Sequence, residues 1–339
     1  MTALKWGLIG ASDIAATRVV DAIRATGGEA VGVASGSSER ARAFAENSGL
    51  PRTATELDEL LGWDVDAVYI SSTNQLHFDQ ACRALRAGKH VLCEKPLALD
   101  AQEAAVMVAL AEELGLVLAA NHHLPGSPLH VKVRELVADG AIGTVLSAKV
   151  AHAVLLPERL RGWRVGGNTP GGGVILDITC HDASVLNPLL GTPVSVSAQA
   201  VRQAAWNTGG QADAAMTVIR YERDGHPPVL AQTHDSFTVG YAATSLEVHG
   251  TAGSIAVADA MTQDTAGRLT LTTAHGSRAV DVDCSEDLYT IGLRAFTSAV
   301  HGTGVPTATG RDGLLALRVA LAAQEAAATG RSVHLNHQH

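Results

Sequence analysis

Residues 6–15 read Trp6-Gly7-Leu8-Ile9-Gly10-Ala11-Ser12-Asp13-Ile14-Ala15, an apolar strand that turns through a glycine into the start of a helix. At such a turn a dinucleotide cofactor places its pyrophosphate against helix N-terminal amides. Gly10 and Ala15 fit the Gly-x-Gly-x-x-Gly/Ala pattern, whereas Ser12 stands where the middle glycine is expected. The stretch therefore predicts either a cofactor-binding turn or an ordinary strand-to-helix turn capped by Ser12 or Asp13.

The first 121 residues repeat this alternation of a short apolar strand with an amphipathic helix, which is typical of a parallel sheet built from βαβ units. Glycines placed to end helices and Ser38 or Asp100 placed to cap them support the boundaries. We expect strands at 5–9, 29–34, 67–71, 90–93 and 117–120, and helices at 14–26, 38–47, 76–87 and 100–114. The predicted fold is a doubly wound α/β domain over residues 1–121.

After Asn121 the pattern changes to long alternating runs separated by polar turns, which predicts antiparallel hairpins. The expected strands are 144–154, 194–200, 214–221, 229–237, 245–248, 254–257 and 268–273, with helices at 129–139, 288–300 and 313–329. We interpret residues 122–339 as an α+β substrate-binding domain with a large, mostly antiparallel sheet.

The composition excludes several classes of protein. The 339 residues carry a formal charge of −9 with 4% aromatic residues, so the basic footprint of a nucleic-acid binder is missing. No apolar run reaches the ~20 residues that span a bilayer, and no leader pattern precedes the first strand. Four scattered cysteines favour a reducing cytoplasm, and the histidines lack metal-ligand spacing. We expect a cytoplasmic protein without membrane, nucleic-acid or metal partners.

The segment after the second predicted strand bears on cofactor choice. An acid at that strand end would accept the ribose hydroxyls of NAD, but the chain reads Ala34-Ser35-Gly36-Ser37-Ser38-Glu39-Arg40, with Glu39 inside the helix. Small hydroxyls, a helix N-terminus and Arg40 could hold a 2′-phosphate, which favours NADP(H) while leaving NAD(H) possible. The alternative is a capped helix with a solvated Arg40.

Two further motifs carry groups suited to catalysis. Glu94-Lys95-Pro96 follows the buried strand 90–93, so Lys95 should lie at the carboxyl edge of the sheet, where it could polarise a carbonyl or remain solvated. In the second half, Gly171-Gly172-Gly173 opens a helix that places Asp177 and His181 four residues apart. Asp177 could orient His181 and favour its protonated form, or the two could be an exposed polar pair.

Taken in this order, the three elements resemble the glucose-fructose oxidoreductase/inositol dehydrogenase/rhizopine-catabolism (Gfo/Idh/MocA) family. Members carry a Rossmann domain, a Glu-Lys-Pro after the fifth strand and an Asp-x-x-x-His pair after a glycine-rich turn. Stretches 72–77, 138–143 and 247–254 are similar to family segments as well, so the resemblance covers nearly the whole chain. Within the family, 6–15, 121–123, 152–157, 162–164 and 171–182 are most similar to members that reduce 1,5-anhydro-D-fructose to 1,5-anhydro-D-mannitol.

The resemblance implies three sets of site residues. Those at the reacting atoms are Lys95, His181 and Asp177. Those at the cofactor are Gly10, Ser12, Ile14, Ala15, Ser35, Arg40, Ser72, Thr73, Asn74, His77, Glu94 and Lys95. Those at the substrate are His123, Trp163, Arg164, Asp177 and His181. The roles of Asp177 and the neighbouring Asp182 stay unseparated.

The resemblance also implies an activity, NADPH-dependent reduction of a sugar ketone, with His181 as proton donor and Lys95 polarising the oxygen. An NAD(P)-dependent polyol, inositol or sugar dehydrogenase of the same family is one alternative, and a non-catalytic nucleotide-binding ligand sensor is another. The expected partner is a small sugar or polyol. A monomer, a homodimer and a homotetramer all stay open.

Overall fold

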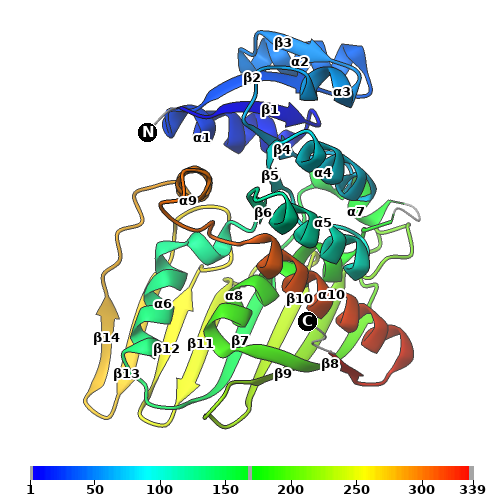
Figure 1. The fold of residues 1–339 in the computed structure, drawn as a ribbon. Helices are drawn as coiled ribbons and strands as arrows, with labels where there is room; N and C mark the ends of the chain where they lie inside the picture. The colour runs from blue at the N-terminus through cyan, green and yellow to red at the C-terminus, as the bar shows by residue number, and fades with distance from the viewer. Residues whose placement is uncertain (1–2, 167–169, 336–339) are drawn as a thin grey trace. The chain divides into compact units, whose positions relative to one another are not determined.

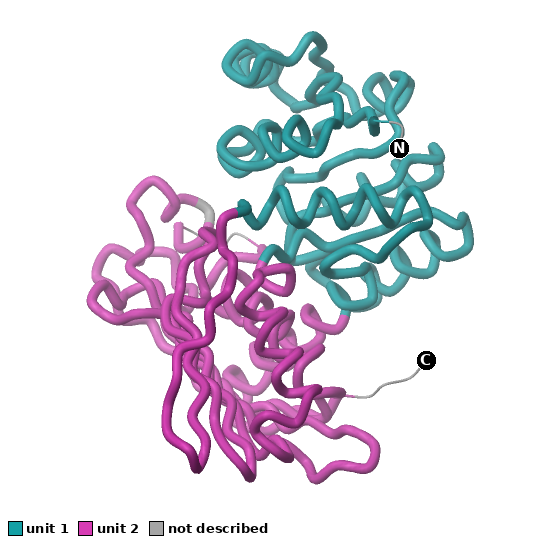
Figure 2. The backbone as a smooth tube through the Cα atoms, turned by 90° about the vertical axis from the view of Figure 1, so that its left-hand side faces the viewer, with its two compact units in different colours: residues 1–123, 286–314 teal, residues 124–285, 315–339 magenta. Residues whose placement is uncertain are grey.

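The computed structural model describes residues 3–166 and 170–335. The chain divides into two compact units, one of residues 1–123 and 286–314 and the other of residues 124–285 and 315–339 (Figure 2). Within the described ranges, no helix is long and apolar enough to cross a membrane.

The first unit is built on a parallel sheet with the strand order β3-β2-β1-β4-β5-β6, which is the order of a dinucleotide-binding domain (Figure 1). Its strands are β1 (Lys5–Ile9), β2 (Glu29–Ala34), β3 (Arg52–Ala54), β4 (Ala67–Ile70), β5 (His90–Cys93) and β6 (Leu118–Ala120). Its helices are α1 (Val20–Ala25), α2 (Ser38–Ser48), α3 (Leu57–Leu61), α4 (His77–Arg86), α5 (Ala101–Glu113) and α9 (Leu288–Val300). The expected α/β fold is confirmed.

The core of the first unit joins segments that are far apart in the sequence. Trp6 of β1 is fully buried, and its ring lies 5.1 Å from that of Phe296 in α9. Leu293 of α9 belongs to the same buried cluster as Ile23 of α1 and Val19, which directly precedes α1. Burying side chains of this size stabilises the fold by roughly 1.5–3 kcal/mol each, so α9 completes the unit that begins at β1.

The second unit contains, in its described part, a nine-stranded sheet with the order β14-β13-β12-β11-β7-β10-β9-β8-β15. Its strands are β7 (Val145–Ala153), β8 (Thr192–Val201), β9 (Ala214–Glu222), β10 (Val229–Ser236), β11 (Ser245–Gly250), β12 (Gly253–Ala258), β13 (Arg268–Thr273), β14 (Gly276–Val280) and β15 (Val333–His334). Neighbouring strands are antiparallel except β7 and β10, which pair in parallel. A mostly antiparallel sheet is therefore confirmed.

The helices of the second unit are α6 (Pro128–Ala138), α7 (Arg161–Val165) and α8 (Cys180–Leu190), and α10 (Gly310–Thr329) begins in the first unit and ends in the second. Helices α6 and α8 contact each other, and α8 contacts β7 and β10 (Figure 1). On β9 buried and exposed residues alternate, as expected for a strand with one covered face, and Met216 and Val218 lie on its exposed face.

Some local expectations were wrong. The hydroxyl of Ser37, not Ser38, caps α2 by accepting the backbone N–H of Arg40 at 3.3 Å, because Ser37 keeps the extended backbone that an N-cap requires. Asp100 caps α5 as expected. The elements β3, α3, α7, β14 and β15 were not predicted, since segments of two to five residues show too little periodicity.

Candidate active site

The turn after β1 is shaped by a close approach of two backbone segments. Gly10 has φ +106°, and a Cβ at this position would lie 2.6 Å from the backbone nitrogen of Ser72. Only glycine adopts this conformation without strain and leaves room for the second segment. The loop after β4 therefore passes directly over the turn that the sequence predicts for the cofactor.

Ser12 closes the first turn of the following helix. Its Oγ accepts the backbone N–H of Ala15 at 3.2 Å and donates to Oγ of Ser71 at 2.8 Å. Ala15 is fully buried and Ile14 packs partly buried against the core. Ser12, which departs from the glycine pattern, thus connects the turn after β1 to the end of β4 through its hydrogen bonds. The predicted cap by Ser12 is therefore present, and it is compatible with a cofactor-binding turn.

The end of β2 leads into an exposed helix start. Ser35 donates its backbone N–H to the carbonyl of Ala54, and Gly36 has open space where a Cβ would be. Arg40 is exposed in the first turn of α2, whose N-cap is Ser37. A helix N-terminus and a guanidinium at the end of the second strand suit an anionic group such as a 2′-phosphate.

The loop after β4 contributes Ser72, Thr73 and Asn74. Oγ of Ser72 donates to Oε1 of Gln80 at 2.6 Å, and Thr73 precedes the short 3-10 turn Asn74–Leu76. Asn74 is buried, and its Nδ2 has no hydrogen-bond partner among the described residues. A buried donor without a partner beside the Gly10 turn fits a site for a ligand rich in acceptors, as a dinucleotide is.

His77 lies beneath two loops. Its Nδ1 is 2.9 Å from the carbonyl oxygen of Pro96, and its Nε2 is 3.2 Å from that of Ser72. The ring is fully buried, and burial lowers its pKa. His77 therefore joins the loop after β4 to the Glu94-Lys95-Pro96 segment.

Glu94 organises the carboxyl edge of the sheet. Its Oε1 accepts the hydroxyl of Tyr69 at 2.7 Å and the side-chain amide of Asn121 at 2.6 Å, and its Oε2 accepts the backbone N–H of Lys95 at 3.3 Å. These donors come from the ends of β4, β5 and β6. Glu94 thus fixes the backbone that carries Lys95. The peptide bond between Lys95 and Pro96 is cis. The sequence analysis did not single out Tyr69 or Asn121.

Two histidines follow β6 in the same unit. His122 is buried, and its pKa is lowered to about 3 by burial and by the charge of Lys95. The ring of His123 stacks on that of Tyr289, with centroids 5.4 Å apart. The first unit therefore gathers Lys95 and a neutral His122 at the edge where ligands bind in such folds.

In the second unit, Asp177 and Arg164 form an ion pair. Nε of Arg164 donates to Oδ2 of Asp177 at 2.8 Å, and Asp177 is buried. The pair connects α7 with the π-helical segment Ile175–Thr179 that precedes α8. Trp163 belongs to α7, but its side chain lies outside the described residues.

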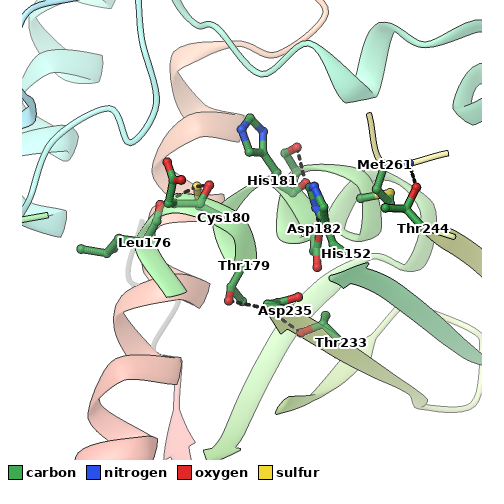
Figure 3. A network of polar contacts seen from close by, with 12 residues as sticks. His152, Leu176, Thr179, Cys180, His181, Asp182, Thr233, Asp235, Thr244 and Met261 are labelled. Atoms are coloured by element: carbon green, nitrogen blue, oxygen red, sulfur yellow. Dashed lines mark hydrogen bonds and ion pairs between the residues drawn. The ribbon is translucent and has the colours of Figure 1, made fainter. Parts of the chain in front are cut away.

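His181 lies in the first turn of α8 beside a second histidine. Only 7% of His181 is exposed, so the interpretation of Asp177 and His181 as an exposed pair is wrong. The centroid of the His152 ring, from β7, lies 6.3 Å from that of His181, and Nδ1 of His152 is hydrogen-bonded to Oδ1 of Asp182 at 2.7 Å (Figure 3). Asp182 thus has a role distinct from that of Asp177, which pairs with Arg164.

Asp235 of β10 lies next to Asp182, and its Oδ2 accepts the hydroxyls of Thr179 and Thr233 (Figure 3). The sequence analysis missed this residue. The available signal was an Asp at an inward position of an alternating strand, where apolar residues are expected. In the described part of the chain, no group of three or more His, Cys, Asp or Glu is arranged to hold a metal ion.

The first unit has a parallel sheet in dinucleotide-binding order with a lysine at its carboxyl edge. The second unit has a buried helical segment with an Asp-x-x-x-His pair. These features define a two-domain nicotinamide-dependent dehydrogenase. Residues 4–122 match the family model "Oxidoreductase family, NAD-binding Rossmann fold", and residues 130–256 match "GFO/IDH/MocA C-terminal domain". The chain belongs to the Gfo/Idh/MocA oxidoreductase family.

Three known proteins illustrate the likeness. A 1,5-anhydro-D-fructose reductase from Ensifer adhaerens is 46% identical over 98% of this chain and 98% of its own. A 3-ketoreductase from Actinomadura kijaniata, solved with TDP-benzene and NADP, shares 27% identity with a TM-score of 0.79 over 97% of this chain and 98% of its own. An aldose-aldose oxidoreductase from Caulobacter crescentus, with 24% identity and a TM-score of 0.87 over 98% and 100%, has the same fold.

Proposed function

We propose that the chain reduces a sugar ketone with NADPH, and that its substrate is 1,5-anhydro-D-fructose, which is reduced to 1,5-anhydro-D-mannitol. The observation that carries the proposal is the 46% identity, over nearly the full length of both chains, to a reductase of that sugar. The buried His181 and the fixed backbone of Lys95 supply the acid and the cation that such a reduction requires.

The turn after β1 would hold the pyrophosphate of the cofactor, with Ser12 closing the helix start and the unpartnered Nδ2 of Asn74 as a donor. Ser35 and Arg40 would bind the 2′-phosphate that distinguishes NADPH from NADH. When bound there, NADPH would supply the hydride that the reduction of the carbonyl carbon requires. We assign the selection of NADPH to Arg40, because a guanidinium can bind a phosphate through two parallel hydrogen bonds.

The carbonyl oxygen gains negative charge as its carbon is reduced, and it must then receive a proton. We assign that proton to His181 and the polarisation of the oxygen to Lys95. General-acid help of this kind contributes about 10²- to 10⁴-fold to the rate. A fixed cation adds to it by stabilising the charge that develops in the transition state.

The remaining predicted substrate residues suit a neutral sugar. The charge of Arg164 is balanced by Asp177, so this pair offers hydrogen bonds without a net charge for a carboxylate. His123, stacked on Tyr289, would add a polar edge to the site. We propose that Trp163 also belongs to the sugar-binding residues.

The test is an initial-rate assay with NADPH and NADH against anhydroketoses, osones, inososes and simple aldehydes. We expect the highest kcat/KM for NADPH with 1,5-anhydro-D-fructose, and 1,5-anhydro-D-mannitol as the product identified by NMR. Absence of reduction of every carbonyl, together with oxidation of a polyol, would show instead a dehydrogenase in which His181 acts as the base.

A further inference from the structure

Two carboxyl groups are buried side by side in the second unit. Asp182 of α8 and Asp235 of β10 are both fully buried. Within the part of the chain that the structure describes, neither carboxyl forms an ion pair with a lysine or an arginine. Placing two anions in one apolar site costs several kcal/mol per ion, so the two groups need another way to balance their charge.

Their hydrogen bonds divide the four oxygens into two kinds. Oδ2 of Asp235 accepts the hydroxyls of Thr179 and Thr233, and Oδ1 of Asp182 is hydrogen-bonded to Nδ1 of His152 at 2.7 Å (Figure 3). The other two oxygens, Oδ2 of Asp182 and Oδ1 of Asp235, accept no hydrogen bond from any other described group. The two side chains lie next to each other (Figure 3), and a proton on one carboxyl would let it donate to the other and satisfy both of these buried oxygens.

The surroundings identify which carboxyl carries the proton. Burial and the neighbouring Asp182 raise the pKa of Asp235 well above its usual range, whereas burial raises that of Asp182 to about 7. Oδ2 of Asp235 accepts two hydroxyls and so acts as a carbonyl oxygen, which leaves Oδ1 as the site of the proton. The other titratable groups that face the pair are His152 on β7, Tyr221 on β9 and, beyond His152, His130 on α6.

We propose that Asp182 and Asp235 form an acid pair that holds one shared proton and positions His152 beside His181. Asp235 carries the proton on Oδ1 and donates it to Oδ2 of Asp182. Asp182, as a carboxylate, then fixes the hydrogen of His152 on Nδ1. The first part of the proposal concerns the pair alone, whereas the effect on turnover rests on the proposed role of His181.

A fixed tautomer gives the pair a function in the reaction. When Nδ1 of His152 carries the hydrogen, Nε2 of the neutral ring is an acceptor. His152 therefore presents one defined ring edge next to the proposed proton donor, instead of a mixture of two tautomers. Asp182, Asp235 and His152 act as positioning residues, because none of them is assigned to the reacting atoms.

The first experiment uses infrared spectroscopy on the substrate-free protein. We expect the wild type near pH 8 to show the C=O stretching band of a buried protonated carboxyl, and Asp235→Asn to lose it. Asp213→Asn is the matched control, because Asp213 is equally buried but accepts the backbone N–H groups of Gln203 and Ala204 and the amide of Asn207. This control should keep the band. A wild type without the band, or Asp235→Asn with it, would overturn the shared proton.

The second experiment reads the tautomer of His152 by ¹⁵N NMR. We expect Nδ1–H in the wild type and in Asp235→Asn, because the amide of Asn can donate to Asp182 as the protonated carboxyl does. Asp182→Leu should lose this preference. A wild-type ring protonated on Nε2 alone would overturn the positioning of His152. Neither experiment uses substrate, so both remain decisive if the proposed sugar is wrong.

The third experiment separates positioning from packing through turnover. Asp182→Leu and Asp235→Leu should lower kcat by about 10- to 100-fold, the usual effect of losing a group that orients a functional side chain, with little change in NADPH affinity. Asp235→Asn should restore most of the lost kcat. Folding of each variant is checked by circular dichroism. Equal kcat for Asp235→Leu and Asp235→Asn, both folded, would overturn the role in turnover.

Discussion

The side-chain amide of Asn121 and the hydroxyl of Tyr69 donate to one oxygen of Glu94, at 2.6 Å and 2.7 Å. Glu94→Gln replaces one acceptor oxygen by an NH₂ group, which is a donor. Because the partners of Glu94 also donate, the new NH₂ group must face at least one of these donors. We expect a loss of about 1–3 kcal/mol in the free energy of unfolding, measured by urea denaturation, and a lower kcat because Lys95 loses its fixed backbone.

Glu112→Gln is the control for this variant. Glu112 forms an exposed ion pair with Arg311 in the same unit, and such pairs contribute at most about 1 kcal/mol. If both variants lost the same small amount of stability, Glu94 would not be the organiser of the sheet edge.

Replacement of the proposed proton donor should separate catalysis from binding. His181→Asn removes the acid but keeps a polar side chain in the first turn of α8. We expect kcat to fall by about 10²- to 10⁴-fold, with the Kd for NADPH, measured by fluorescence titration, nearly the same. His226→Asn, in an exposed turn of the same unit, should keep the wild-type kcat. Unchanged turnover in His181→Asn would refute the assignment.

Cofactor preference should depend on a single guanidinium. Arg40→Ala is expected to raise the Kd for NADPH by about ten- to a hundredfold, because the charge-assisted hydrogen bonds to the 2′-phosphate are lost, and to leave the Kd for NADH nearly unchanged. Arg42→Ala is the matched control, because Arg42 is exposed on the same helix and its Nε donates to the backbone carbonyl of Ser38. Equal effects of Arg40→Ala on both cofactors would show a general role in helix α2.

Much of the fold could be predicted because its signals are local. The strands Lys5–Ile9, Glu29–Ala34, His90–Cys93 and Arg268–Thr273 and the helix Leu288–Val300 have the predicted bounds, since each is an apolar or periodic run between turn residues. The place of Leu288–Val300 in the first unit could not be predicted. It depends on contacts such as that of Phe296 with Trp6, nearly the whole chain length away in sequence.

The candidate site could likewise be predicted only where its signal is local. Motifs of adjacent residues, such as 94–96 and 177–181, identify candidate catalytic groups. The side chains that these segments contact come from other elements: Tyr69 and Asn121 contact Glu94, and His152 contacts Asp182, which follows His181. Only strand pairing and helix packing bring these side chains together, so a linear pattern does not show them.

Acid should destabilise the second unit through His130. The ring is buried in α6 and donates Nδ1–H to the carbonyl oxygen of Leu124 at 2.8 Å, and burial lowers its pKa from 6.5 to about 4. Between these two values the unfolded chain binds a proton that the folded protein does not. As the pH is lowered below 6.5, the free energy of unfolding therefore decreases because of this group. The decrease is at most about 1.4 kcal/mol for each pH unit.

His130→Gln removes this titration and keeps a donor for Leu124. We expect the variant to be less stable than the wild type at neutral pH, because a well-packed buried ring is lost. The difference should shrink by about 2 kcal/mol between neutral pH and about pH 4.5 in urea denaturation, because only the wild type loses the contribution of His130. His226→Gln, exposed to solvent, should follow the wild type at every pH. A difference between His130→Gln and the wild type that stays constant with pH would mean that the pKa of His130 is the same in the folded and unfolded protein.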